Sequence, residues 1–79
     1  MNNMSRLSPI HYKKLAHVFE RSGFVLDRVE GDHLIYVRKG TVRPVVIPKY
    51  RSVPVFIILN NLRSAGMSRE EYFVLLRQK

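Results

Sequence analysis

The spacing of apolar residues is helical in the first quarter of the chain. Between residues 9 and 22 the apolar side chains recur on one helical face. Ser8 and Pro9 predict the start of this helix, because serine caps exposed N–H groups and proline loses nothing at the first helical position. Gly23 predicts its end, and Phe24 supplies the apolar residue that often follows such a cap.

The middle of the chain has a strand-like pattern interrupted by turn residues. We expect strands over residues 24–30, 33–38 and 41–47, separated by the pairs Gly31-Asp32 and Lys39-Gly40. Turns this short join antiparallel neighbours, so the three strands predict a meander. Pro44 cannot donate a backbone hydrogen bond and should lie on an edge or at a bulge.

Helical spacing returns in the last third of the chain. A second helix is expected over residues 53–65, with Gly66 after it. Ser68 and Glu71 form a capping box that begins a short last helix. The sequence therefore predicts one α+β domain over residues 1–79, in the order α-β-β-β-α-α, with the helices on one face of a three-stranded antiparallel sheet. The apolar pattern leaves open which face of the middle strand is buried.

Composition excludes several kinds of protein. The chain has 79 residues and no cysteine, which rules out disulfides and thiolate metal sites. His11 and His17 do not have the spacing of a metal-binding pair, and we expect no metal and no other cofactor. The longest apolar run has seven residues and contains Pro54, too short to cross a membrane. The N-terminus lacks the apolar core of a signal peptide, so we expect a cytoplasmic protein.

The positive charge is concentrated in one segment. The net charge is +8, and residues 38–51 contain five cationic side chains and no acidic one. Such a segment favours a polyanion, most often nucleic acid, although a solvated basic loop has the same composition. Tyr50 lies among these cations and could stack on a base. The predicted RNA-binding residues are Arg38, Lys39, Arg43, Lys49, Tyr50 and Arg51.

His33 follows the Gly31-Asp32 turn directly, where the second strand should begin. One interpretation is a histidine that only makes a hydrogen bond in the turn. The other is a general base or acid that acts on RNA, since histidine as a residue type has an unperturbed pKa of about 6.5. Metal-free RNA cleavage needs a base for the 2′-hydroxyl, a proton donor for the leaving 5′-oxygen and cations around the phosphate.

Five segments, taken in order, carry a resemblance to a known family. They are Gly23-Phe24, the Gly-x-His-x-x-Tyr pattern of Gly31, His33 and Tyr36, then Val46-Ile47-Pro48, Ile58-Leu59 and residues 62–72. Together they resemble the HicA-type toxins of bacterial toxin–antitoxin modules. That family consists of small mRNA interferases with a fold like that of double-stranded-RNA-binding domains. The resemblance covers nearly the whole chain.

The resemblance implies a catalytic role for His33, metal-independent cleavage of mRNA and a HicB-type antitoxin that covers the active site. The chain departs from the family motif at Asp32 and Leu34, where a serine and a second histidine are frequent. This departure motivates a second hypothesis, a non-catalytic RNA-binding module on the same fold. A third is a protein-interaction domain whose charge is incidental.

Overall fold

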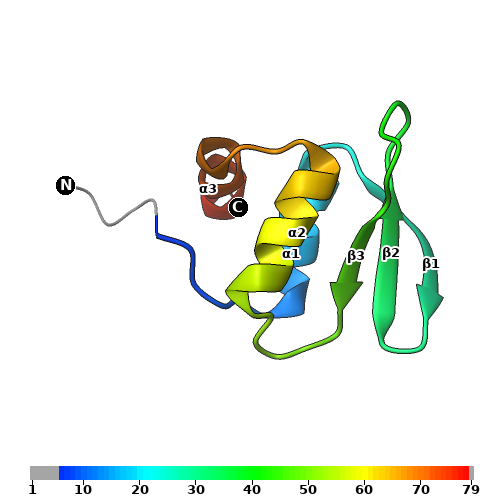
Figure 1. The fold of residues 1–79 in the computed structure, drawn as a ribbon, viewed down its shortest axis with the longest axis horizontal. Coiled ribbons are helices and arrows are strands. Elements are labelled where there is room, and N and C mark those ends of the chain that lie inside the picture. Colours follow the sequence, from blue (N-terminus) through cyan, green and yellow to red (C-terminus); the bar gives the residue numbers. More distant parts are fainter. Residues whose placement is uncertain (1–5, 79) are drawn as a thin grey trace.

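The computed structural model describes residues 6–78 and has the predicted α+β architecture (Figure 1). The order α-β-β-β-α-α and the three-stranded antiparallel sheet are those of a domain like the double-stranded-RNA-binding domains. The helices lie on one side of the sheet. The elements are α1 (Tyr12–Arg21), β1 (Val25–Glu30), β2 (His33–Val37), β3 (Val45–Pro48), α2 (Val55–Ala65) and α3 (Arg69–Arg77).

The first helix begins later than predicted, because the segment before it is held in an extended pairing. Ile10 and Val53 exchange backbone hydrogen bonds of 3.3 and 2.7 Å across an antiparallel bridge. A residue in such a bridge cannot be helical, so the predicted start at Ser8 and Pro9 is wrong. The N-cap is instead His11, whose Nδ1 accepts a hydrogen bond of 3.1 Å from the N–H of Lys13.

The predicted ends of the first two helices are confirmed. Gly23 has a φ of +99°, and the N–H of the next residue, Phe24, bonds to the carbonyl of Phe19 at 3.0 Å. The rings of Phe19 and Phe24 also meet edge to face. Gly66 ends α2 in the left-handed conformation with a φ of +66°. Both ends are Schellman caps, a conformation in which glycine has no Cβ penalty.

The sheet has the order β1-β2-β3, so β2 is paired on both sides. The Gly31-Asp32 turn is confirmed, since Glu30 pairs directly with His33 across it. The third strand is shorter than predicted and covers Val45–Pro48. Residues 41–44 belong instead to the connection after β2, in which the N–H of Thr41 bonds to the carbonyl of Arg38 at 3.0 Å.

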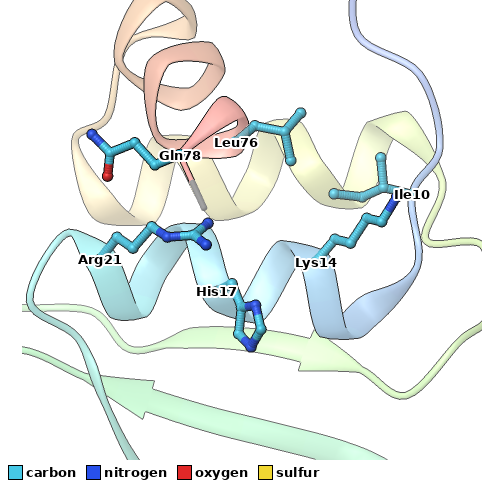
Figure 2. Close-up of a pocket in the computed structure, with 6 residues that line it drawn as sticks. All are labelled: Ile10, Lys14, His17, Arg21, Leu76 and Gln78. Atoms are coloured by element: carbon cyan, nitrogen blue, oxygen red, sulfur yellow. The ribbon is translucent and has the colours of Figure 1, made fainter.

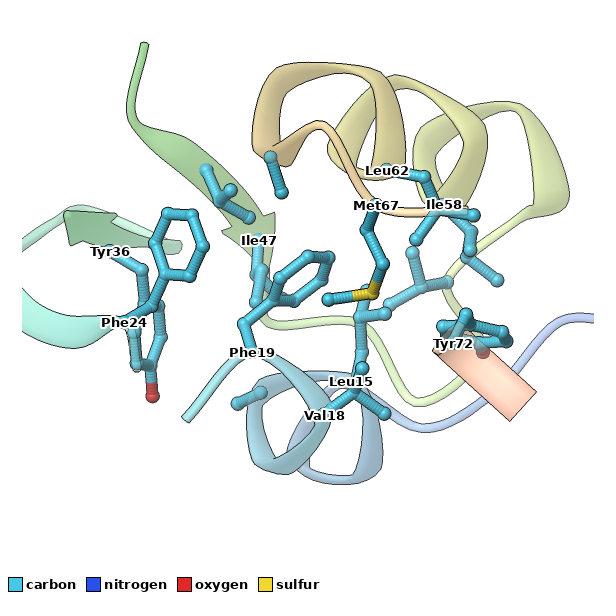
Figure 3. Close-up of a cluster of buried hydrophobic side chains, with 14 of the residues drawn as sticks. Leu15, Val18, Phe19, Phe24, Tyr36, Ile47, Ile58, Leu62, Met67 and Tyr72 are labelled. Atoms are coloured by element: carbon cyan, nitrogen blue, oxygen red, sulfur yellow. The ribbon is translucent and has the colours of Figure 1, made fainter. Parts of the chain in front are cut away.

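The structure resolves which face of β2 contacts the helices. Leu34 and Tyr36 belong to the main hydrophobic core, together with Val45 and Ile47 of β3 (Figure 3). Ile35 is also buried but points to the opposite face, where its cross-strand neighbours are Arg28 and Val46. The central strand is therefore apolar on both faces: Leu34 and Tyr36 enter the core, and Ile35 lies between its cross-strand neighbours Arg28 and Val46.

The helices lie next to β3, and β1 is the strand farthest from them (Figure 1). The helical side of the core comes mainly from α1 and α2, with Tyr72 of α3 closing one end (Figure 3). All six residues of β1 are exposed, including Leu26 and Val29. The largest fully buried side chains are Tyr72, Phe19, Phe24, Leu15, Ile47, Ile58, Val18, Val45 and Val53.

The buried phenol of Tyr72 makes stability depend on pH in alkaline solution. No described residue bonds to its hydroxyl, and burial raises the pKa of Tyr72 to about 12. An unfolded chain ionises its tyrosines near pH 10, so between about pH 10 and about pH 12 the folded chain keeps the Tyr72 proton that the unfolded chain has lost. Tyr72 alone should then lower the free energy of unfolding by up to about 1.4 kcal/mol per pH unit until about pH 12.

Tyr72→Phe should remove this part of the alkaline loss. Urea unfolding followed by circular dichroism at pH 7, 10 and 11 measures it, and Tyr50→Phe makes the same chemical change on an exposed ring. At pH 7 the Tyr72→Phe protein should be at least as stable as the original chain, because the lost hydroxyl has no partner among the described residues. If the free energy of unfolding falls equally steeply above pH 10 in Tyr72→Phe and Tyr50→Phe, the alkaline loss does not come from Tyr72.

Candidate functional site

His33 is the first residue of β2 and lies at one end of the sheet (Figure 1). Its backbone is paired with Glu30 of β1 on one side and Pro48 of β3 on the other. The side chain is exposed, and no described residue makes a hydrogen bond or ion pair with the imidazole. The residue therefore has a fixed backbone and an imidazole that is free to contact a ligand.

His33 lines a pocket between β3 and α2, which we call the His33 pocket. Its volume is about 290 Å³. The strand side is apolar, and the helix side is mostly polar. The lining residues are His33, Pro44, Val46, Pro48, Tyr50, Ile57, Asn60, Asn61 and Ser64.

Sequence reasoning did not identify the three polar residues that α2 contributes to this pocket. Asn60 and Asn61 interrupt an otherwise apolar run between residues 53 and 62, which was the available signal. Asn61 is only 4% exposed, and its Nδ2 donates to the carbonyl of Val46 at 3.0 Å. This bond holds α2 against β3 and so fixes the two walls of the pocket. Ser64 follows on the same helix.

Three of the predicted RNA-binding residues come directly after β3, at the same end of the sheet as His33. Lys49 is tied to the His33 turn, because its N–H bonds to the carbonyl of Asp32 at 2.7 Å. Tyr50 lines the pocket and is 45% exposed, while its carbonyl accepts from the N–H of Tyr12. Lys49 and Arg51 are exposed and make no ion pair with a described residue.

The remaining predicted cations lie elsewhere. Lys39 and Arg43 are exposed in the connection between β2 and β3, at the opposite end of these strands (Figure 1). A strand rises about 3.3 Å per residue, so the length of β2 puts roughly 15 Å between the two ends. The basic segment of residues 38–51 therefore forms two separate groups of cations, with β3 between them.

Arg38 is part of the scaffold. Its guanidinium donates to the carbonyls of Ser22 and Ala65, at 2.9 and 3.2 Å, and to Oγ1 of Thr41 at 3.0 Å. The same group lies over the ring of Phe24, with 4.4 Å between Cζ and the ring centroid. Arg38 thus joins the ends of α1 and α2 to the sheet, and its guanidinium is engaged in these contacts and not directed to an RNA phosphate.

Tyr36 does not reach the His33 pocket. It points to the helical face of the sheet, where its hydroxyl donates to Oε2 of Glu20 at 2.6 Å. Burial and the neighbouring carboxylate both raise the pKa of Tyr36 well above its usual value. The family-like Gly-x-His-x-x-Tyr pattern therefore contributes one residue to the pocket and one to the core.

A second groove lies between α1 and α3 (Figure 2). Its volume is about 310 Å³. Lys14, His17 and Arg21 follow one another along α1, and Leu76 faces them from α3. Arg21 donates to the carbonyl of Leu75 at 3.1 Å, which joins the two helices. This groove shares no lining residue with the His33 pocket.

Residues 6–78 lack the features of two other kinds of site. They contain no cluster of three or more histidine, cysteine, aspartate or glutamate side chains placed to hold a metal ion. Within the same residues, no helix has the length and apolar character needed to cross a bilayer. The His33 pocket brings one imidazole together with the polar side chains of Asn60, Asn61 and Ser64.

Comparison with known protein families identifies a match. A family model described as the HicA toxin of bacterial toxin–antitoxin systems matches residues 12–67. The match starts with α1, ends just after α2 and includes every residue that lines the His33 pocket. No curated protein matches the chain.

The role of Arg38 in the scaffold predicts a large loss of stability in Arg38→Met. The variant removes three charge-assisted hydrogen bonds and leaves the carbonyls of Ser22 and Ala65 without this donor. We expect about 2–3 kcal/mol of destabilisation and a melting temperature lower by about 10 °C. Lys39→Met is the matched control on an exposed neighbour and should change stability by less than about 0.5 kcal/mol. Equal melting temperatures for the two variants would contradict the assignment.

Proposed function

Since the chain belongs to the HicA family of bacterial toxin–antitoxin toxins, we propose that it is a metal-independent endoribonuclease that cleaves mRNA at the His33 pocket. One observation carries this proposal. An exposed imidazole, unpaired among the described residues, lines a pocket, and the backbone of Lys49 bonds to the turn just before it. The family match covers this region, and a histidine at the end of the sheet that also carries Lys49 and Arg51 suits acid–base chemistry on a phosphodiester.

The proposed reaction begins with loss of the proton from a ribose 2′-hydroxyl. The 2′-oxygen attacks the adjacent phosphorus, the bond from phosphorus to the 5′-oxygen breaks, and that oxygen takes up a proton. The products are a 2′,3′-cyclic phosphate and a 5′-hydroxyl, so atoms and protons balance. His33 acts as the general base or the general acid, and Lys49 and Arg51 offset the charge that develops on the phosphate.

The two groups of cations suggest a path for the RNA. Lys49 and Arg51 follow β3, and Arg43 precedes it, so a single strand laid along β3 would meet cations at both ends. Lys39 lies in the same connection as Arg43 and would contact the same part of the strand. Tyr50 is exposed beside His33 and offers a ring on which a base can stack.

The family also supports an antitoxin partner, and we propose a HicB-type protein that covers the His33 pocket. Covering this pocket would block the imidazole and Tyr50 together, since both line it. Because the proposed substrate is mRNA, we place the action of this toxin in the cytoplasm.

Asp32 favours a second candidate function, a non-catalytic RNA-binding module. Its side chain is exposed next to His33, and no described residue pairs with its carboxylate. An unpaired carboxylate beside the imidazole repels phosphate and opposes chemistry there. In this alternative the cations and Tyr50 bind RNA and His33 does not act on it.

His33→Ala distinguishes the two functions. If His33 is the acid–base group, purified protein should cleave RNA in EDTA, and the variant should lose about 10²–10⁴-fold in rate. His17→Ala replaces another exposed histidine, on α1, and should keep the full rate. Gel analysis of labelled RNA measures both.

Three other outcomes point elsewhere. Undiminished cleavage by His33→Ala would exclude the proposed role. No cleavage by any protein, with RNA binding that weakens steeply as salt is raised, would support the RNA-binding module. Neither cleavage nor salt-dependent binding would favour a protein-interaction domain.

A further inference from the structure

One residue that lines the His33 pocket, Asn60, has a hydrogen-bond donor without a partner among the described residues. Oδ1 of Asn60 accepts a hydrogen bond of 3.1 Å from Nη1 of Arg63. A guanidinium can only donate, so the oxygen of the Asn60 amide must face Arg63, and the NH₂ group must face away. No described residue accepts a hydrogen bond from this NH₂ group. A lining residue of the pocket thus has a donor available to a ligand.

The next residue provides an unmatched acceptor. Nδ2 of Asn61 donates to the carbonyl of Val46, which can only accept, and this bond fixes the orientation of the second amide. Its Oδ1 is buried and has no partner among the described residues. A buried acceptor without a partner costs about 1–3 kcal/mol, and native proteins rarely keep one without a reason. A donor group that enters the pocket and shifts this amide slightly would supply the missing partner.

The other walls suit a flat, uncharged ring. Pro44, Val46 and Pro48 form an apolar surface along β3, and Tyr50 adds an exposed aromatic ring. Apart from His33, no ionisable residue other than Tyr50 lines the pocket. The cations that could bind a phosphate, Lys49 and Arg51, do not line the pocket. A planar group with apolar faces and a polar edge is therefore the better fit.

We propose that the His33 pocket is a nucleobase-binding subsite in which Tyr50 stacks on the base and the Asn60 amide hydrogen-bonds to its edge. Single-stranded RNA is commonly recognised in this way, with bases splayed out onto aromatic rings and bonded at their edges. Base identity at this subsite then selects which phosphodiester lies next to His33. This inference rests on the proposed function and adds sequence preference to it.

Binding of mononucleotides tests the subsite without any cleavage step. AMP, GMP, CMP and UMP contain no phosphodiester between nucleotides, so their binding can be measured whether or not the protein is a nuclease. Each nucleotide should be titrated into the protein, and the backbone amide resonances followed by NMR. The resonances of β3 and α2 should shift, and the tightest-binding nucleotide should bind about tenfold more tightly than the weakest-binding one. Equal affinities for all four, or no shift at millimolar nucleotide, would overturn the proposal.

Asn60→Asp tests the residue that we assign to the base edge. The variant keeps the size of the side chain and an oxygen facing Arg63, but it replaces the NH₂ donor by an acceptor. We expect it to lose the tenfold preference. Gln78→Glu makes the same amide-to-acid change on an exposed residue outside the pocket and should keep the preference. A preference that persists in Asn60→Asp would exclude this amide from base recognition.

The results also separate this inference from the function on which it rests. If the protein binds one nucleotide selectively but does not cleave RNA, the base-binding subsite is supported and the nuclease function is rejected. Cleavage that depends on His33, together with equal binding of all four nucleotides, would reject only the subsite.

Discussion

Pairing of the central strand on both sides is the constraint on which the rest of the structure depends. Because β2 is bonded to β1 and to β3, its side chains alternate strictly between the two faces. Leu34 and Tyr36 enter the core beneath the helices, while Ile35 points to the other face between Arg28 and Val46. The same pairing fixes the backbone of His33 at the rim of the sheet and leaves its imidazole outside the core.

Local signals were sufficient to predict the fold. The glycine that follows each of the first two helices, the Gly31-Asp32 turn and the Ser68 cap each determine the conformation of only a few neighbouring residues, and the structure confirms all of them. The start of α1 could not be predicted in this way. It depends on a bridge between Ile10 and Val53, which are far apart in the sequence, and a pattern of residues near Pro9 contains no information about that partner.

The site was only partly predictable for the same reason. The Gly31-Asp32 turn, which is visible in the sequence, predicted that His33 begins a strand at the end of the sheet. The cations of residues 38–51 are continuous in sequence, but β3 separates them into two groups in the structure. Arg38 was predicted to bind RNA, but its guanidinium bonds to carbonyls at the ends of two helices that are distant in sequence. The asparagines of α2 reach His33 only through packing of α2 on β3, which no local spacing records.

The chemistry proposed for His33 depends on the ribose 2′-hydroxyl, so the most direct test changes that group in the substrate. Matched RNAs, one unmodified and one carrying 2′-O-methyl groups throughout, should be incubated with the protein in EDTA and the ends of the products identified by mass spectrometry. The account predicts that only the unmodified RNA is cut, with 2′,3′-cyclic phosphate and 5′-hydroxyl ends. Cleavage of the methylated RNA, or products with 5′-phosphate ends, would contradict it.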